Sequence, residues 1–328
     1  MKGLNLNSSL QIFIEGLILE KRSLGYKYES SARLLYIFDH FCLKYGYEDA
    51  VLTKNIVHAW MQKNPNESLA TLHSRACVVR QLALYMTRLG IEAYVLPKNT
   101  IPKAPHYLPY IFSDREIAAL FQQIDNCHYC AEVPLRHRIM PLLFRLLYGC
   151  GLRISEALHL KLQDVDLQSG VLTILDGKFN KDRLVPMSLK NSQRCLDYAD
   201  EVHQISDGNV YFFPSPSGRA MTKGNVYKNF RRFLWQARIS HGGWGKGPRL
   251  HDIRHTYTVH CLRQWVLQGK DLAAYLPVLK TYLGHDSFRD TSQYLRLTAD
   301  LYPDITGKME KAFGNVIPQA GGAAHEAD

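Results

Sequence analysis

The chain has 328 residues, a formal net charge of +10 at pH 7 and a hydrophobic fraction of 46%. That fraction is typical of a globular protein, and the length is large for one core, so two domains are expected. No apolar run is as long as a membrane span and the N-terminus lacks an apolar signal core, which predicts a cytoplasmic protein that does not enter a membrane. The basic excess suits a polyanionic partner.

Residues 1–95 are predicted to form an all-helical domain, because apolar residues recur there at helical spacing. The fourth helix, from about residue 67 to 90, is expected to turn one face inward, with Val78, Leu82, Tyr85 and Leu89. Its other face would carry Arg75 and Arg80, which fit either a solvated surface or contacts with DNA phosphates. Residues 1–105 hold 13 Lys and Arg against 8 Asp and Glu, so much of the positive charge lies here.

Residues 96–110 contain four prolines and no helical period, which predicts an extended linker. The second domain, residues 111–314, is expected to open with a capping box between Ser113 and Glu116 and to contain a buried helix near residues 138–148. Apolar runs at 171–175 and 183–187 predict a β-hairpin. The glycine-rich stretch 241–247 is interpreted as a connector rather than a lid, and residues 315–328 as a disordered tail. The fold class is therefore mainly α with a small antiparallel β-sheet.

Six polar residues that could act together in one reaction lie along the second domain. They comprise two guanidiniums, an ammonium, two imidazoles and a phenol: Arg153, Lys178, His251, Arg254, His285 and Tyr294. This set can attack a phosphodiester without a metal ion, since arginine forks can take the place of Mg²⁺ on the nonbridging oxygens. No cofactor is expected. Cys127 and Cys130 lack the second ligand pair of a zinc site, so no metal is predicted there either.

Each of these residues also has an ordinary structural interpretation. Arg153 could form a buried ion pair with Glu156, and Arg254 could be a surface helix residue. Lys178 could be a solvated turn lysine. If the catalytic interpretation holds, Arg153 and Arg254 grip the phosphate, Tyr294 is the nucleophile, and a neighbouring imidazole relieves it of its proton.

The chain resembles the tyrosine recombinases of the phage-integrase family. The resemblance rests on Tyr148-Gly149-Cys150-Gly151-Leu152-Arg153-Ile154-Ser155-Glu156, on Gly177-Lys178, on His251-Asp252-Ile253-Arg254-His255, on Leu283-Gly284-His285, and on Thr291 and Tyr294. These matches run in order over about the last two thirds of the chain. The resemblance implies a helical core-binding domain and a mixed α+β catalytic domain. It also implies strand cleavage through a 3′-phosphotyrosyl link with a free 5′-hydroxyl.

Within that mechanism His251 is the expected proton acceptor and His285 the expected hydrogen-bond donor to the phosphate. Lys178 is the expected general acid for the leaving 5′-oxygen, with Lys181 as the other candidate in the same turn and as a possible DNA contact. The implied partner is double-stranded DNA with specific core sites, bound by four protomers on two sites. The apolar stripe from Ile305 to Phe313 could dock into a neighbouring protomer or fold back on its own domain.

The biological role is open at the level of the sequence. The stretch between Arg254 and His285 is longer than in compact Xer-type recombinases, which favours integration, excision or transposition of a mobile element. The alternatives are resolution of chromosome or plasmid dimers by an Xer-type enzyme, and relaxation of DNA by a type IB topoisomerase-like activity. A DNA-binding protein that kept the fold but lost activity is disfavoured, because all six candidate residues are present.

Overall fold

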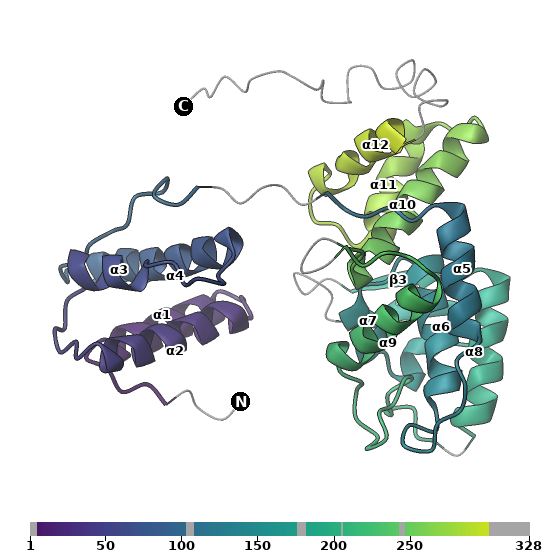
Figure 1. The fold of residues 1–328 in the computed structure, drawn as a ribbon, viewed down its shortest axis with the longest axis horizontal. Coiled ribbons are helices and arrows are strands. Elements are labelled where there is room, and N and C mark those ends of the chain that lie inside the picture. The colour runs from purple at the N-terminus through teal and green to yellow at the C-terminus, as the bar shows by residue number, and fades with distance from the viewer. Residues whose placement is uncertain (1–4, 103–107, 176–181, 205, 243–246, 302–328) are drawn as a thin grey trace. The chain divides into compact units, whose positions relative to one another are not determined.

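The computed structural model describes residues 5–102, 108–175, 182–204, 206–242 and 247–301 (Figure 1). Contacts between Cα atoms divide the chain into two compact units, residues 1–107 and 108–328. The division falls inside the stretch 96–110 that the prolines marked as a linker. Each unit has a hydrophobic core of its own. None of the helices among the described residues combines the length and the apolar character needed to cross a bilayer.

The first unit is helical, as its periodicity predicts. It comprises α1 (Gln11–Ser23), α2 (Glu29–Lys44), α3 (Lys54–Trp60) and α4 (Leu69–Arg88). In Figure 1, α1 lies beside α2, and α4 packs against both α1 and α2, while α3 contacts α2. The carboxylate of Asp39 on α2 is fully buried and accepts hydrogen bonds from the backbone N–H groups of Asn7 and Ser8. This contact fixes the start of α1 on α2.

Arg75 lies on the inner face of α4, which corrects its predicted place on the outer face. Only 8% of the residue is exposed, and its guanidinium lies 4.3 Å from the ring centre of Trp60. It also pairs with Glu67 at 2.6 Å. Positions 75, 79, 82 and 86 share one helix face, so the same spacing that places Leu82 inside also places Arg75 there. Leu89 is 54% exposed, because α4 ends one residue before it.

The other arginines of α4 differ from Arg75. Arg80 is half-buried, and Arg88 is exposed and bonded to Glu20 at 2.6 Å.

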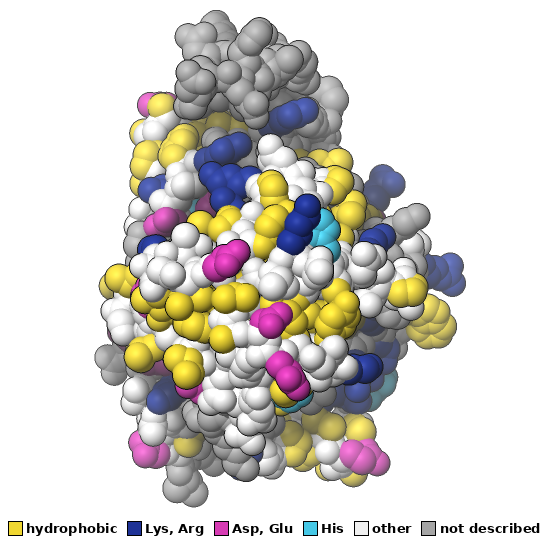
Figure 2. All heavy atoms as spheres, turned by 90° about the vertical axis from the view of Figure 1, so that its left-hand side faces the viewer, with side chains coloured by type: hydrophobic (Ala, Val, Ile, Leu, Met, Phe, Trp, Pro, Cys, Tyr) yellow, Lys and Arg dark blue, Asp and Glu magenta, His cyan; other side chains and the backbone are white. Residues whose placement is uncertain are grey.

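On the face that Figure 2 presents, hydrophobic side chains form a band across the front, with acidic and basic side chains interspersed around it. That face is therefore not uniformly basic.

The core of the first unit extends beyond residue 95. Leu96 is 2% exposed and belongs to this core, and Ile101 packs against it. Tyr110 and Phe112 belong to the core of the second unit. The segment between the two cores is therefore shorter than the predicted linker, residues 96–110.

Limited digestion tests this boundary. We expect trypsin to cut first after Lys103 when DNA is absent, because this lysine lies between the last residue of one core and the first residue of the next. Mass spectrometry of the early fragments would identify the cut. A stable fragment that contains residues 96–110 intact would contradict a linker in this segment.

The second unit begins with α5 (Asp114–Asp125), whose first turn has the predicted capping box between Ser113 and Glu116. The strongly apolar helix α6 (Arg136–Gly149) packs against α5, α8 (Leu189–Val202) and α10 (Leu250–Leu267), which explains its burial on several sides. The remaining helices are α7 (Ile154–His159), α9 (Lys223–Gln236), α11 (Leu272–Leu283) and α12 (Arg289–Leu301). A second apolar cluster joins α10, α11 and α12.

A three-stranded antiparallel sheet in the order β1-β2-β3 lies within this unit. Its strands are β1 (Val165–Asp166), β2 (Val171–Ile174) and β3 (Arg183–Pro186). Ile174 pairs with Arg183, so β2 and β3 form the predicted hairpin. Mainly helical architecture with a small antiparallel sheet is thus confirmed. The hairpin turn 176–181, the stripe 305–313 and the tail 315–328 lie outside the described residues, as does the greater part of the connector 241–247.

Candidate active site

Arg153 is positioned by a sharp turn between α6 and α7. Gly151 has a φ of +58°, and a Cβ atom there would meet Tyr257 at 2.6 Å, so only glycine fits both the backbone angle and the space. Arg153 follows in extended conformation and caps α7. Its Nη2 donates to the carbonyl of Gly284 at 2.8 Å. The turn thereby brings the guanidinium to the C-terminal end of α11.

Glu156 is the carboxylate around which the arginines gather. Its two oxygens accept from both terminal nitrogens of Arg183, at 2.9 and 2.8 Å, and from Nη1 of Arg153 at 2.7 Å. Burial raises the pKa of Glu156, but the hydrogen bonds and charge of Arg183 and the bonds from Arg153 outweigh it and hold that pKa at about 2. The ion pair considered for Arg153 is therefore present, and it includes a second arginine from β3.

Arg254 is buried rather than a surface residue. Only 1% of it is exposed, and it donates through Nη1 to the carbonyl of Gly151 at 2.7 Å and through Nη2 to that of Leu283 at 2.5 Å. Burial, and next the charge of Arg153, lower its pKa to about 9, so it stays protonated at neutral pH. Two of its five N–H groups make these bonds, and Nη1 also lies 4.0 Å from a carboxylate oxygen of Glu156.

His285 follows the end of α11. Gly284 ends this helix with a φ of +64°, and a Cβ atom there would lie 3.0 Å from Nη1 of Arg183. The Nδ1 atom of His285 shares a hydrogen bond of 2.9 Å with the hydroxyl of Thr291, which is fully buried. Burial, and then the charge of Arg254, lower the pKa of His285 to about 3, so its ring is neutral.

Tyr294 lies on α12 with its ring parallel to that of His285 at a centroid distance of 6.0 Å. Its hydroxyl bonds to Nδ1 of His255 at 2.6 Å, and the residue is 1% exposed. Burial raises the pKa of this phenol to about 12, against the opposing charges of Arg254 and Arg153. The phenol is therefore protonated at neutral pH.

His251 begins the same helix turn as Arg254 but is more exposed than the other site residues. Its ring meets that of His255 edge-on at 4.6 Å between centroids. The Tyr294 hydroxyl bonds to His255, a residue that the sequence did not single out as a proton acceptor. His255, whose ring contacts that of His251, therefore bonds to the phenol in the way that was predicted for His251.

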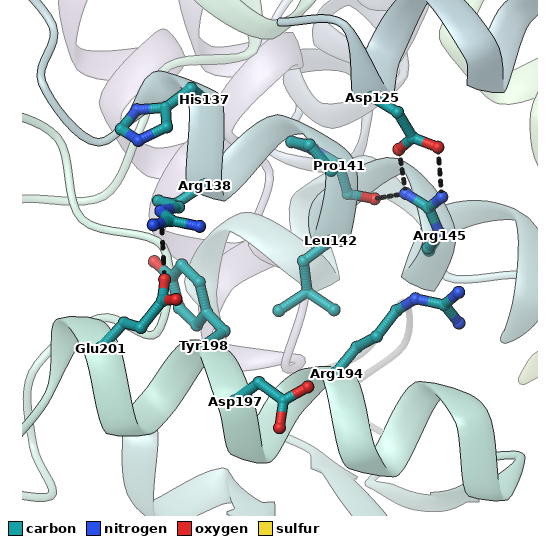
Figure 3. A pocket seen from close by; sticks show the side chains of 10 residues that line it. All are labelled: Asp125, His137, Arg138, Pro141, Leu142, Arg145, Arg194, Asp197, Tyr198 and Glu201. Carbon is teal, nitrogen blue, oxygen red and sulfur yellow. Dashed lines mark hydrogen bonds and ion pairs between the residues drawn. The ribbon is translucent and has the colours of Figure 1, made fainter. Parts of the chain in front are cut away.

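Two hollows in the second unit can be compared as binding sites. The larger, of about 420 Å³, lies between α6 and α8 (Figure 3). Two of its three arginines are paired with acids, since Arg145 bonds to Asp125 at 2.6 Å and Arg138 to Glu201 at 3.1 Å. The smaller, of about 220 Å³, is lined by Arg153, Asp182, Arg183, Lys280, Thr281, Gly284, His285 and Asp286. The smaller hollow contains the predicted site residues Arg153 and His285, so it is the better candidate.

The structure brings together Arg153, His251, Arg254, His285 and Tyr294 of the predicted set. Lys178 and Lys181 lie outside the described residues. Three residues that were not predicted as site members also belong to the group: Glu156, Arg183 and His255. Glu156 and His255 stood within the quoted motifs, whereas Arg183 gave no signal beyond its place at the start of a strand. Among the described residues, no group of three His, Cys, Asp or Glu could hold a metal ion.

A substitution of Glu156 tests the carboxylate hub. Glu156→Gln should lower the free energy of unfolding by about 3 kcal/mol, because it leaves Arg183, with an 8% exposed side chain, without its buried counter-charge. Urea unfolding at neutral pH would measure the change. Glu201→Gln is the matched control, since the Glu201–Arg138 pair is about half exposed and should cost less than about 1 kcal/mol. Equal losses in the two variants would contradict a structural role for Glu156.

The second unit is mainly helical and its candidate site holds a tyrosine among arginines and histidines, and comparisons with known proteins show which class of enzyme has this arrangement. Residues 112–300 match the model of the phage integrase family. The chain is 30% identical over 310 residues to the putative integrase/recombinase y4rB of Sinorhizobium fredii, covering 93% of this chain and 98% of the relative. The chain therefore belongs to the phage integrase family and is a tyrosine recombinase, which cleaves and rejoins DNA at specific sites.

Further similarities concern the recombinase XerC of Staphylococcus saprophyticus and two solved structures. XerC is 29% identical over 67% of this chain and 65% of its own length. The XerH recombinase bound to its palindromic difH substrate has a TM-score of 0.63 at 20% identity, covering 92% of this chain and 85% of that one. The Tn1549 transposon integrase with circular-intermediate DNA has a TM-score of 0.60 at 16% identity, covering 86% and 94%. At these identities the two structures show the fold.

Proposed function

We propose that this recombinase cleaves each DNA strand by attack of Tyr294 on the scissile phosphate, with a 3′-phosphotyrosyl intermediate. The observation that carries the proposal is the burial of a tyrosine hydroxyl within a cluster that contains Arg254 and neutral histidines. A phenol in such a cluster can act as a nucleophile, because the cations stabilise the negative charge that builds up on the phosphate oxygens during attack.

Arginines take the place of a metal in this proposal. Arg153 and Arg254 keep N–H groups beyond those used by Glu156 and by carbonyl groups, and Arg153 lines the 220 Å³ hollow beside His285. Each preorganised donor to the developing negative charge can contribute about 3 kcal/mol to transition-state stabilisation. Because Tyr294 and Arg254 are each 1% exposed, binding of DNA has to uncover them before attack.

The covalent ester would make rejoining independent of an energy source. The phosphotyrosyl bond replaces the broken phosphodiester with a bond of the same type, and a free 5′-hydroxyl can reverse the step. The partner proposed is double-stranded DNA with specific core sites, in agreement with the net charge of +10 and with the DNA complexes of XerH and the Tn1549 integrase. Arg80 and Lys181 remain proposed DNA contacts. The enzyme would act in the cytoplasm.

We place the enzyme in the movement of a mobile element, with four protomers on two sites. The long interval between Arg254 and His285 supports this role, and the relative that matches nearly the whole chain is a putative integrase/recombinase. The XerC similarity, over two thirds of the chain, supports dimer resolution as the second candidate. A topoisomerase-like activity would relax DNA without exchanging partners.

The decisive experiment begins with selection of bound duplexes from a random library, which identifies the core site directly. A substrate nicked beside the scissile bond should then trap the enzyme covalently at that site. Two plasmids bearing the site should exchange flanking DNA. Trapping with relaxation but no exchange would favour the topoisomerase-like alternative. Inverted core sites beside the gene would support a mobile element over dimer resolution.

Cleavage is expected to survive chelation. Arg153 and Arg254 provide the positive charge of the proposed site, and the site histidines add hydrogen-bond donors. EDTA at about 10 mM should therefore leave the initial rate of covalent trapping within about twofold. The rate with added Mg²⁺ is the comparison. Complete loss of trapping in EDTA, restored by Mg²⁺, would contradict the mechanism.

A further inference from the structure

The hydroxyl of Tyr294 has a specific partner that no predicted role accounts for. It lies 2.6 Å from Nδ1 of His255, on the helix that also carries Arg254. This distance is short for a bond between a phenol and a ring nitrogen, and both residues are largely shielded from solvent. The pair is formed by residues 39 positions apart, so the packing of α12 on α10 creates it.

His255 has the charge state that a proton acceptor needs. Burial, and next the charges of His251 and Arg254, lower its pKa to about 3, so the ring is neutral when no DNA is bound. A neutral imidazole with its proton on Nε2 presents a lone pair at Nδ1. The phenol can then donate its proton along the existing hydrogen bond.

The other polar groups of the site are less suited to this task. Guanidiniums have no lone pair to offer, which excludes Arg153 and Arg254. The Nδ1 atom of His285 is bonded to Thr291, and its ring lies parallel to the phenol rather than end-on to the hydroxyl. The ring of His251 lies 4.6 Å from the ring of His255 between centroids, and His255 is the residue that bonds to the phenol.

We propose that Nδ1 of His255 takes the phenolic proton of Tyr294 as the tyrosine attacks the scissile phosphate. This inference rests on the proposed function. The O–H bond of the phenol breaks and its proton passes to His255, while the phenolic oxygen forms the new bond to phosphorus. The bond from phosphorus to the 5′-oxygen breaks, and that oxygen leaves with the electron pair and takes a proton from a separate acid. During rejoining His255 returns its proton to the departing tyrosine.

DNA itself would help His255 in this step. The phosphate brings negative charge to a site where burial and neighbouring cations disfavour imidazolium. An anion nearby favours the protonated ring, so binding of DNA makes His255 a stronger base at the time when it is needed. The neighbouring groups that act on it are His251, Arg254 and Tyr294.

The test uses His255→Asn in the full chain, because the Asn amide oxygen can still accept a hydrogen bond near the position of Nδ1 but cannot take up the proton. Single-turnover trapping on the nicked substrate should slow by about a hundredfold. A fluorinated tyrosine introduced at position 294 has a more acidic phenol and should recover a large part of that loss. His285→Asn with the same fluorotyrosine should show no recovery.

His260→Asn is the matched control, since His260 lies on the same helix and its Nδ1 bonds to the hydroxyl of Tyr148 at 2.9 Å. It should cleave at the wild-type rate with similar thermal stability. Cleavage by His255→Asn at the wild-type rate or faster overturns the proposal. Faster cleavage would indicate that the hydrogen bond to His255 restrains the Tyr294 hydroxyl from attack. A slow variant without recovery also overturns it and indicates a purely structural role. If the wild type forms no covalent complex at any site, the proposed function fails along with this inference.

Discussion

Tyr294→Phe is expected to bind its DNA site with nearly unchanged affinity and to form no covalent complex. The substitution removes one oxygen atom and retains the ring, which packs in the apolar cluster of α10, α11 and α12. The loss of the bond to His255 should cost about 1 kcal/mol of stability, too little to unfold the unit. The attacking oxygen is absent, so trapping should fall below detection. Denaturing gels of the nicked substrate and fluorescence anisotropy would measure the two properties.

A second tyrosine provides the control for this result. Tyr148→Phe also removes a hydroxyl that is hydrogen-bonded to a histidine, since the Tyr148 hydroxyl lies 2.9 Å from Nδ1 of His260. His260 is not a predicted site residue. It should trap DNA at the wild-type rate. Covalent product from Tyr294→Phe would show that another residue is the nucleophile.

Lys178→Ala is expected to slow cleavage of normal DNA by about a hundredfold and to recover when sulfur replaces the 5′-bridging oxygen. An alkoxide needs a proton in order to leave, whereas a thiolate has a much lower pKa and leaves without one. Lys178 lies outside the described residues, but β3 begins at Arg183, whose guanidinium bonds to Glu156 in the site. The strand that follows the turn is thus anchored at the candidate active site. Rapid-quench cleavage of the oxygen and sulfur substrates gives the two rates.

Two further variants separate the possible causes of a slow reaction. Arg153→Ala should be slow on both substrates, because the charge on the nonbridging oxygens needs stabilisation whichever group leaves. Lys181→Ala should resemble the wild type if Lys178 is the acid, and it should show the sulfur recovery if the roles are reversed. Equal defects of Lys178→Ala on oxygen and sulfur would exclude it as the general acid.

Local signals in the sequence are sufficient for the elements and for the members of the catalytic motifs. The apolar period of α1 and the capping box at Ser113 depend on residues within a few positions of each other, so they can be identified without the tertiary structure. Charge can predict the wrong helix face for a residue. The charge of Arg75 favours an outer position, although its spacing from Leu82 puts it inside, where Trp60 and Glu67 compensate its burial.

The sequence by itself predicted the fold class and the family, which are confirmed, and it predicted Arg153, Arg254, His285 and Tyr294 as one chemical set, which stays a prediction. Only the tertiary structure decided which groups touch. Arg183 reaches Glu156 from 27 positions away, and Tyr294 reaches His255 from 39 positions away. Such pairs leave no periodic trace, because they depend on how α7, β3, α10 and α12 pack around a common point. Burial there sets the pKa values of the phenol and the imidazoles, and burial is a property of the assembled core rather than of any local segment.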